Sequence, residues 1–261
     1  MSSSYIHGTD TVEQRRLAEL NRLTNGAFLS FLELSPKDRV LEVGCGLALL
    51  ADEVAKLVPD GEVVGLEVSA EQLATARPTQ ANVRLRQGDA LALPFGDTEF
   101  DAVYCRYLLE HVPDPLRALQ EMHRVLRPGG RVFVQENNIL VNVLHPDCPR
   151  FDSVWRRFAE LQTRLGGDAL IGKKLFPLMR EAGFRSVALG VAPEVHWAGS
   201  AGFEPWIVNL IQNVRGAEQE LVSRGLASAA EIEAAVAEMR QLLGRPDASA
   251  FFYWNRASAR K

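Results

Sequence analysis

The sequence predicts an α/β protein built on a mostly parallel sheet of seven strands. Two observations indicate this fold class. Between residues 39 and 136, short apolar segments alternate with segments whose apolar residues recur at helical spacing. The short segments are apolar almost throughout, as parallel strands are when helices cover both faces of a sheet. We therefore expect a doubly wound sheet, whose ligand site lies at the rim formed by the C-terminal strand ends.

The predicted strands follow one another along the chain, separated mostly by helical segments. In order they are RVLEVG, EVVGLEV, VRLRQGD, FDAVYCR, GRVFVQE, RSVALGVAPEV and SAFFYWNRASA, which begin at residues 39, 62, 83, 100, 130, 185 and 249. We expect the last strand to be antiparallel to the others.

Capping residues mark the helices between the strands. Ser69 and Gln72 have the spacing of a capping box, and Asp114 followed by Pro115 pairs an N-cap with a proline at the first helical position. The Pro-Gly-Gly run at residues 128–130 predicts the end of that helix and the turn into the next strand.

We expect one domain over residues 1–261 with helical additions. Residues 1–34 contain an amphipathic segment that starts with a capping box, which predicts an N-terminal helical cap. Residues 137–180 and 197–245 hold helical segments and many aromatic residues. We interpret these two stretches as a helical lid that covers the substrate.

Composition limits the classes of function. The chain has 261 residues, 47% of them hydrophobic, and a formal net charge of -4, which gives no basic face for nucleic acid. Its three cysteines are too few and too irregularly spaced for a disulfide framework or a zinc site, so we expect no metal and a cytoplasmic location. No window reaches the roughly 18 apolar residues that a membrane-spanning helix needs.

Four groups of residues fall at the expected C-terminal ends of successive strands. They are Glu42-Val43-Gly44-Cys45-Gly46, Glu67, Gly88-Asp89-Ala90 and Cys105-Arg106. Taken singly, each group also fits a structural role as a tight turn, a solvated strand end or a cap. Their order favours a site for a nucleotide-containing cofactor. The dinucleotide motif G-x-G-x-x-G is incomplete, because Leu49 stands where its third glycine belongs and a helix is expected from Leu47.

Longer segments around these residues follow one another over about residues 34–136. They are VLEVGCGLALLA, VVGLEVSAEQL, VRLRQGDALALPFGDTEFDAVYCRYLLEHVPDP and VLRPGGRVFVQE. In this order they resemble the motifs of the class I S-adenosylmethionine-dependent methyltransferases, in particular the small-molecule group related to the ubiquinone and menaquinone methyltransferases. Two positions depart from the pattern: Ala48 replaces the usual third glycine, and Glu67 replaces the aspartate of many relatives. The resemblance implies a Rossmann-like fold, with S-adenosylmethionine as cofactor and S-adenosylhomocysteine as product.

The resemblance also implies roles for the residues at the strand ends. Glu67 would accept hydrogen bonds from both ribose hydroxyls. Gly44 and Gly46 would let the backbone pass close to the cofactor, where a Cβ would intrude. Asp89, together with the Ala90 backbone, would bind the adenine.

Further residues complete the expected cofactor site. Glu42 either holds the ammonium group of the cofactor through water or braces the glycine turn, and Gln72 reaches the adenosine from its helix. The remaining expected contacts are Tyr5, Arg16, Asn21, Cys45, Val68, Gly88, Cys105 and Arg106.

Methyl transfer is an in-line displacement, so the protein must align donor and acceptor and exclude water. A general base is needed only when the acceptor is protonated. The candidates are His111, which follows the fourth strand, Glu110 beside it, and His145 and His196 in the expected lid. Each of these histidines also fits a packing role.

We expect the acceptor to be an oxygen or nitrogen atom of a small organic metabolite, and the protein to be a monomer or homodimer. The N-P-P-Y or D-P-P-Y motif of amino-methylating nucleic-acid and protein-glutamine enzymes is absent, because residues 105–108 read Cys-Arg-Tyr-Leu. Two alternatives stay open. A protein of the same fold that binds S-adenosylmethionine without transferring methyl would keep Glu67 and Asp89, whereas a nicotinamide-dependent oxidoreductase would need a glycine near Leu49.

Overall fold

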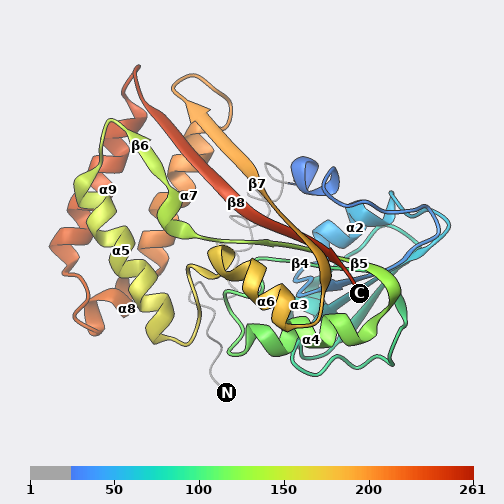
Figure 1. Cartoon of the computed structure of the whole chain (residues 1–261). Helices are drawn as coiled ribbons and strands as arrows, with labels where there is room; N and C mark the ends of the chain where they lie inside the picture. The colour runs from blue at the N-terminus through green and yellow to red at the C-terminus, as the bar shows by residue number, and fades with distance from the viewer. Residues whose placement is uncertain (1–24) are drawn as a thin grey trace. The chain divides into compact units, whose positions relative to one another are not determined.

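The computed structural model describes residues 25–261 (Figure 1). They form two compact units. The first, here called the sheet unit, consists of residues 25–137, 171–191 and 255–261, and the second, the helical unit, consists of residues 138–170 and 192–254. The predicted extents of the cap and the lid stay a prediction. Tyr5, Arg16 and Asn21 lie outside the described residues.

The described strands form one sheet in the order β3-β2-β1-β4-β5-β8-β6, with β7 paired to β8. Their bounds are β1 Arg39–Val43, β2 Glu62–Glu67, β3 Val83–Gln87, β4 Phe100–Arg106, β5 Leu126–Glu136, β6 Val143–His145, β7 Arg185–Trp197 and β8 Ser249–Arg260. Neighbours among β1 to β5 are parallel, and β8 runs antiparallel to β5. The mostly parallel sheet with an antiparallel last strand is thus confirmed.

The sheet has eight strands, one more than the sequence predicts. The additional strand, β6, has three residues and pairs antiparallel with β8 through Val143 and Phe251. Three residues are too few for an alternating pattern to stand out in the sequence.

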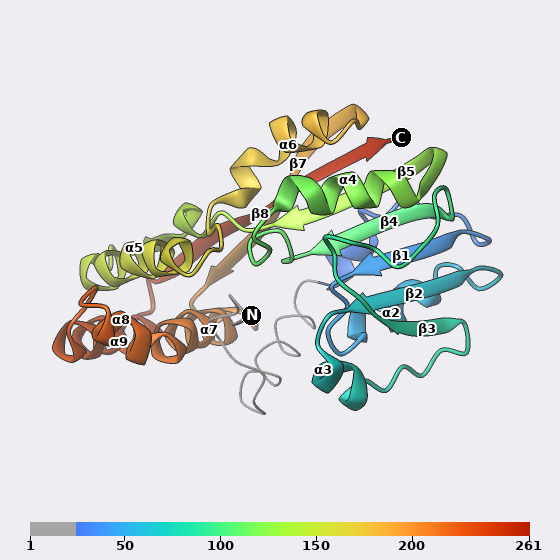
Figure 2. The same cartoon turned by 90° about the horizontal axis from the view of Figure 1, so that it is seen from below.

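Helices cover both faces of the sheet in the sheet unit, as Figure 2 shows for α4 and α6 on one face and α2 on the other. The helices are α2 Leu49–Ala55, α3 Ala70–Thr75, α4 Pro115–Val125 and α6 Leu175–Glu181, with the 3-10 helix η2 Ile171–Lys174. Residues 25–29 are also helical. Side chains alternate along each strand, so Leu41 of β1 packs with α4 and α6 while Val40 packs with α2. This alternation gives the sheet unit two separate hydrophobic clusters.

The predicted helix starts are confirmed in part, but the Pro-Gly-Gly run at residues 128–130 lies inside β5, because α4 already ends at Val125. Asp114 accepts the Arg117 amide with Pro115 at the first position of α4. At α3, Ser69 Oγ accepts the Gln72 amide at 3.2 Å, but the reciprocal contact of the box is replaced, because the Ser69 amide donates to Glu67. The helix expected from Leu47 begins at Leu49 instead, after Ala48 in the left-handed conformation.

The helical unit combines four helices with the ends of two long strands. They are α5 Pro149–Arg164, α7 Phe203–Gly216, α8 Glu218–Ser223 and α9 Ala229–Leu243, with the 3-10 helix η1 Ile139–Val141. Within β8, Ala250, Phe252 and Trp254 are buried while Phe251 and Tyr253 between them are exposed, so one face of the strand carries the core. Across the described part of the chain, none of the helices has the length and hydropathy to cross a bilayer.

Candidate functional site

A turn with three left-handed residues joins β1 to α2. Gly44 and Gly46 have φ angles of 79° and 53°, and Ala48 has a φ of 61°. The amides of Gly44 and Cys45 both donate to the Leu66 carbonyl, at 2.8 and 2.9 Å. The two glycines adopt this conformation without the cost of about 1–2 kcal/mol that a residue with a Cβ, such as Ala48, incurs.

Glu67 ties this turn to the neighbouring strand. It is the last residue of β2 and is 9% exposed. One carboxylate oxygen accepts the Gly46 amide and the other accepts the Ser69 amide, each at 3.0 Å. A carboxylate has about four lone-pair positions, so each oxygen keeps one that can accept a further hydrogen bond.

Gln72 lies beside the same turn. A Cβ built on Gly46 would stand 3.0 Å from Gln72 Oε1, which places the end of this side chain against the turn. Val68, the next residue after Glu67, is 65% exposed, and its carbonyl accepts the Gln87 side-chain amide. The structure thus groups Gly46, Glu67, Val68 and Gln72 at one end of β1 and β2.

Glu42 is buried beneath the turn, at 4% exposure. Burial raises the pKa of its carboxyl to about 8, against smaller lowering effects from Tyr104 and Arg106. Within residues 25–261, Glu42 Oε2 and the Tyr104 hydroxyl are buried and form no hydrogen bond of ordinary geometry, although the two side chains lie close enough to interact. The amides of the glycine turn donate to the Leu66 carbonyl and the Glu67 carboxylate.

Gly88, Asp89 and Ala90 follow β3, and the Gly88 backbone lies next to that of Glu67. The Gly88 amide donates to the Glu67 carbonyl at 3.0 Å. Asp89 Oδ1 accepts the Leu91 amide at 2.9 Å, so this side chain does close a turn, and its second oxygen stays available as an acceptor. Ala90 is buried.

Cys105 and Arg106 end β4, in register with the end of β1. Cys105 is fully buried, and its pKa is raised well above the ordinary value by burial. Arg106 Nη2 donates to Asn25 Oδ1 at 2.9 Å, and its guanidinium lies over the Phe28 ring at 5.3 Å. These contacts connect the start of the described chain to the strand end.

The three candidate histidines have different surroundings. His111 lies in the loop after β4, with Nε2 3.8 Å from Glu110 Oε1. His145 is exposed on β6, opposite Ser249 of β8. His196 is buried against the Trp206 ring at 5.3 Å, as a packing role requires. His111 is in the sheet unit with the strand-end residues, and the other two are in the helical unit.

Three further polar residues were not singled out by the sequence. Glu136 ends β5 fully buried, and its Oε1 accepts the amides of Leu108 and Leu109 at 3.0 and 2.9 Å. Its position after a buried strand is the signal that identified Glu42 and Glu67, so it could have been found in the same way. Tyr104 and Glu121 carry no such signal, because a tyrosine inside a strand and a glutamate inside a helix are ordinary.

Comparisons with known proteins identify relatives of this chain. A family model described as a methyltransferase domain matches residues 41–134. The 2-phytyl-1,4-beta-naphthoquinone methyltransferase of Arabidopsis thaliana, a chloroplastic protein, is 35% identical over 208 residues, which cover 70% of this chain and 75% of the relative. The demethylmenaquinone methyltransferase of Staphylococcus carnosus is 36% identical over 124 residues, or 46% of this chain and about half (52%) of the relative.

A solved structure shows the same fold. A putative methyltransferase from Bacillus halodurans superposes with a TM-score of 0.60 at 20% identity, covering 91% of this chain and 98% of that protein.

Proposed function

Because the chain belongs to the class I S-adenosylmethionine-dependent methyltransferases, we propose that it methylates a small molecule of the 1,4-naphthoquinone type. The likeness to the Arabidopsis naphthoquinone methyltransferase carries this proposal, because it extends over most of both chains. The similarity to a demethylmenaquinone methyltransferase supports the same class of acceptor.

The residues at the strand ends fit S-adenosylmethionine. Glu67 keeps an acceptor position on each oxygen, as two ribose hydroxyls require, and is fixed by the amides of Gly46 and Ser69. Glu42 offers a buried carboxyl group suited to the ammonium group. Asp89 and the Ala90 backbone would take the adenine.

The bound cofactor supplies an electrophilic methyl group on a sulfonium sulfur. The residues of this chain fix the position of the cofactor and limit the access of water. The methyl donor and the acceptor are thereby held in line for the displacement. We assign the proton-accepting role, where the acceptor needs one, to His111, because it shares the sheet unit with the strand-end residues. Glu110 lies beside its ring.

The acceptor class narrows the expected atom. We expected oxygen or nitrogen, but a naphthoquinone nucleus carries no nitrogen. Of these two expected acceptor atoms, oxygen therefore remains, and a ring carbon is the second candidate. The cytoplasmic location and the oligomeric state stay predictions.

Turnover with a labelled cofactor tests the proposal. The purified protein is incubated with a reduced demethylnaphthoquinone and S-adenosylmethionine that carries a trideuterated methyl group. We expect a product heavier by that methyl group in mass spectrometry, and nuclear magnetic resonance of the product identifies the methylated atom. Binding of S-adenosylmethionine without transfer to any member of a quinone panel would instead favour the non-transferring alternative. A nicotinamide-dependent reaction has no support from the family.

A further inference from the structure

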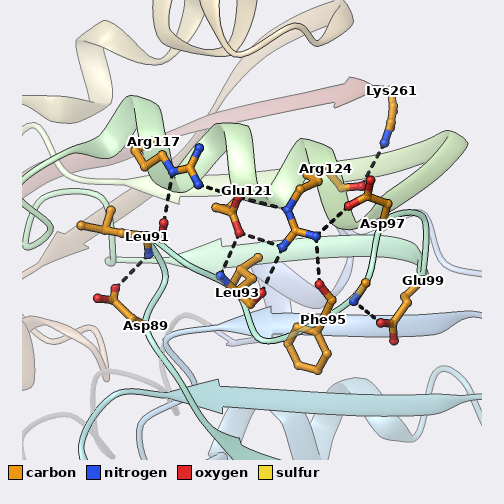
Figure 3. Close-up of polar contacts among 11 residues, drawn as sticks. Asp89, Leu91, Leu93, Phe95, Asp97, Glu99, Arg117, Glu121, Arg124 and Lys261 are labelled. Carbon is orange, nitrogen blue, oxygen red and sulfur yellow. Dashed lines mark hydrogen bonds and ion pairs between the residues drawn. The ribbon is translucent and has the colours of Figure 1, made fainter.

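The segment that carries Asp89 and Ala90 has almost no regular structure of its own. Residues 88–99 connect β3 to β4 and contain one isolated bridge, between Asp89 and Ala92. Backbone groups that leave a strand still need hydrogen-bond partners when they are buried. In this segment side chains of α4 supply four of those partners, to the backbone of Leu91, Leu93 and Phe95 (Figure 3).

Arg124 supplies the largest share. Its Nη2 donates to the Leu93 carbonyl at 3.0 Å, and its Nη1 donates to the Phe95 carbonyl at 2.9 Å. Nη1 also donates to Asp97 Oδ1 at 2.9 Å. A planar guanidinium reaches these acceptors at once, as a lysine ammonium on a flexible stem does not.

Glu121 completes the contact from the adjacent turn of α4. Its Oε2 accepts the Leu93 amide at 2.9 Å and Arg124 Nη2 at 2.8 Å. Its Oε1 is 3.0 Å from Arg117 Nη2, and Arg117 Nε donates to the Leu91 carbonyl at 3.2 Å. Glu121 is only 4% exposed, and hydrogen bonds from Arg124 hold the pKa of its carboxyl below the ordinary value.

The segment is also fixed from the other side. Leu93 and Phe95 are buried in the cluster between the sheet and α4. A Cβ on Gly88 would stand 2.8 Å from Leu66 and 2.9 Å from Pro94. Packing thus confines the backbone that leads from β3 to Asp89, and the contacts from α4 fix its position.

We propose that Glu121 and Arg124 are positioning residues for the adenine end of the cofactor, acting through the backbone of residues 91–95. This inference rests on the proposed cofactor site, in which Asp89 and Ala90 contact the base. Neither α4 residue is proposed to touch the cofactor. Their loss should therefore weaken recognition of the adenine amino group rather than binding as a whole.

The test compares two ligands that differ at that amino group. S-adenosylhomocysteine and S-inosylhomocysteine, in which a carbonyl replaces the amino group, are titrated calorimetrically into wild type, Glu121→Ala and Arg124→Lys. Wild type should prefer the adenosyl ligand, and each variant should lose about tenfold of that preference, the scale of one misplaced hydrogen bond. In each variant, amide hydrogen exchange in the peptide that contains Leu93 should be faster than in wild type, with or without ligand.

A buried ion pair elsewhere in the sheet unit provides the matched control. Asp38 is 5% exposed, accepts the Ser35 amide at 2.8 Å and pairs with Arg131, so it has the same kinds of partner as Glu121. Asp38→Ala and Arg131→Lys should lower the melting temperature to a similar degree and leave the ligand preference unchanged.

Two results in the variants would overturn the proposal. The first concerns Arg124→Lys, which keeps the charge. If this variant prefers the adenosyl ligand within twofold of the wild-type preference, the proposal is wrong. The second is an equal loss of preference in the Asp38 control, which would mean that general destabilisation is the cause. If wild type binds neither ligand, the cofactor site itself is misplaced and the positioning role fails with it. If wild type binds both equally, the adenine contact and the positioning role are refuted, while the rest of the cofactor site stands.

Discussion

Glu42 and Tyr104 are register partners on the neighbouring strands β1 and β4, and interaction with the Tyr104 hydroxyl lowers the pKa of Glu42 against the larger effect of burial. Burial raises the pKa of Glu42 to about 8 and that of Tyr104 well above its ordinary value. Of the charged groups that act on Glu42, Arg106 on β4 favours its ionised form and Glu67 on β2 opposes it. The carboxyl is therefore mostly protonated at neutral pH.

The first prediction concerns stability and pH. Glu42 binds a proton more tightly in the folded chain than in the unfolded one, so between pH 4.5 and about 8 it makes the folded state less stable as the pH rises. Glu42 contributes at most about 1.4 kcal/mol per pH unit to the change of the unfolding free energy with pH. Urea unfolding across this range should show a shallower decline for Glu42→Gln than for wild type. Glu62→Gln, at the exposed start of β2, should keep the wild-type slope.

The second prediction concerns proton release on binding. A cation placed beside Glu42 favours its ionised form, so S-adenosylmethionine binding at pH 7 should release close to one proton. Calorimetry in phosphate and in Tris, whose ionisation enthalpies differ, measures that number. Glu42→Gln should remove the difference between buffers. An identical release in this variant would contradict the assignment of the proton to Glu42.

The third prediction concerns Glu67. Glu67→Ala should lower the affinity for S-adenosylhomocysteine by about 1.5–3 kcal/mol, the scale of charged hydrogen bonds. The same substitution removes the hydrogen-bond acceptor of the Gly46 and Ser69 amides, so the melting temperature should fall as well. Glu67→Gln, which keeps one acceptor oxygen, should lose less on both measures. Wild-type affinity in Glu67→Ala would place the ribose elsewhere.

The fourth prediction separates backbone strain from ligand contact. Gly46 and Gly129 both have positive φ angles, of 53° and 76°, and nothing lies within 4 Å of a Cβ on Gly129. Valine at either position should destabilise the fold by about 1–2 kcal/mol or more. Only Gly46→Val should abolish cofactor binding. Retained binding in that variant would show that the glycine turn does not face the cofactor.

The fifth prediction ranks the histidines. If His111 is the base, His111→Gln should lower turnover by about a hundredfold or more and leave S-adenosylhomocysteine affinity unchanged. His145→Gln and His196→Gln serve as parallel controls with near-normal turnover, although His196→Gln should be less stable because this ring packs on Trp206. A turnover defect confined to His145→Gln or His196→Gln would move the base to the helical unit.

The strand-end residues could be predicted because their signal is local. A buried apolar segment followed by glycine or an acidic residue is visible within about ten positions, as at Glu42 and Glu67. The short strand β6 and the contacts of Glu121 could not be predicted, because they depend on partners at other places in the chain. The contact between Ser69 and Glu67 shows the same limit: the cap was predicted correctly, but a tertiary hydrogen bond replaced half of the capping box.

The hydrogen bonds of Glu67 have a kinetic consequence. Since its carboxylate already holds the amides of Gly46 and Ser69, the turn after β1 and the start of α3 are arranged before any ligand arrives. Encounter with the nucleoside then requires no slow rearrangement of these elements. These two elements should therefore add no plateau to the dependence of the association rate on ligand concentration.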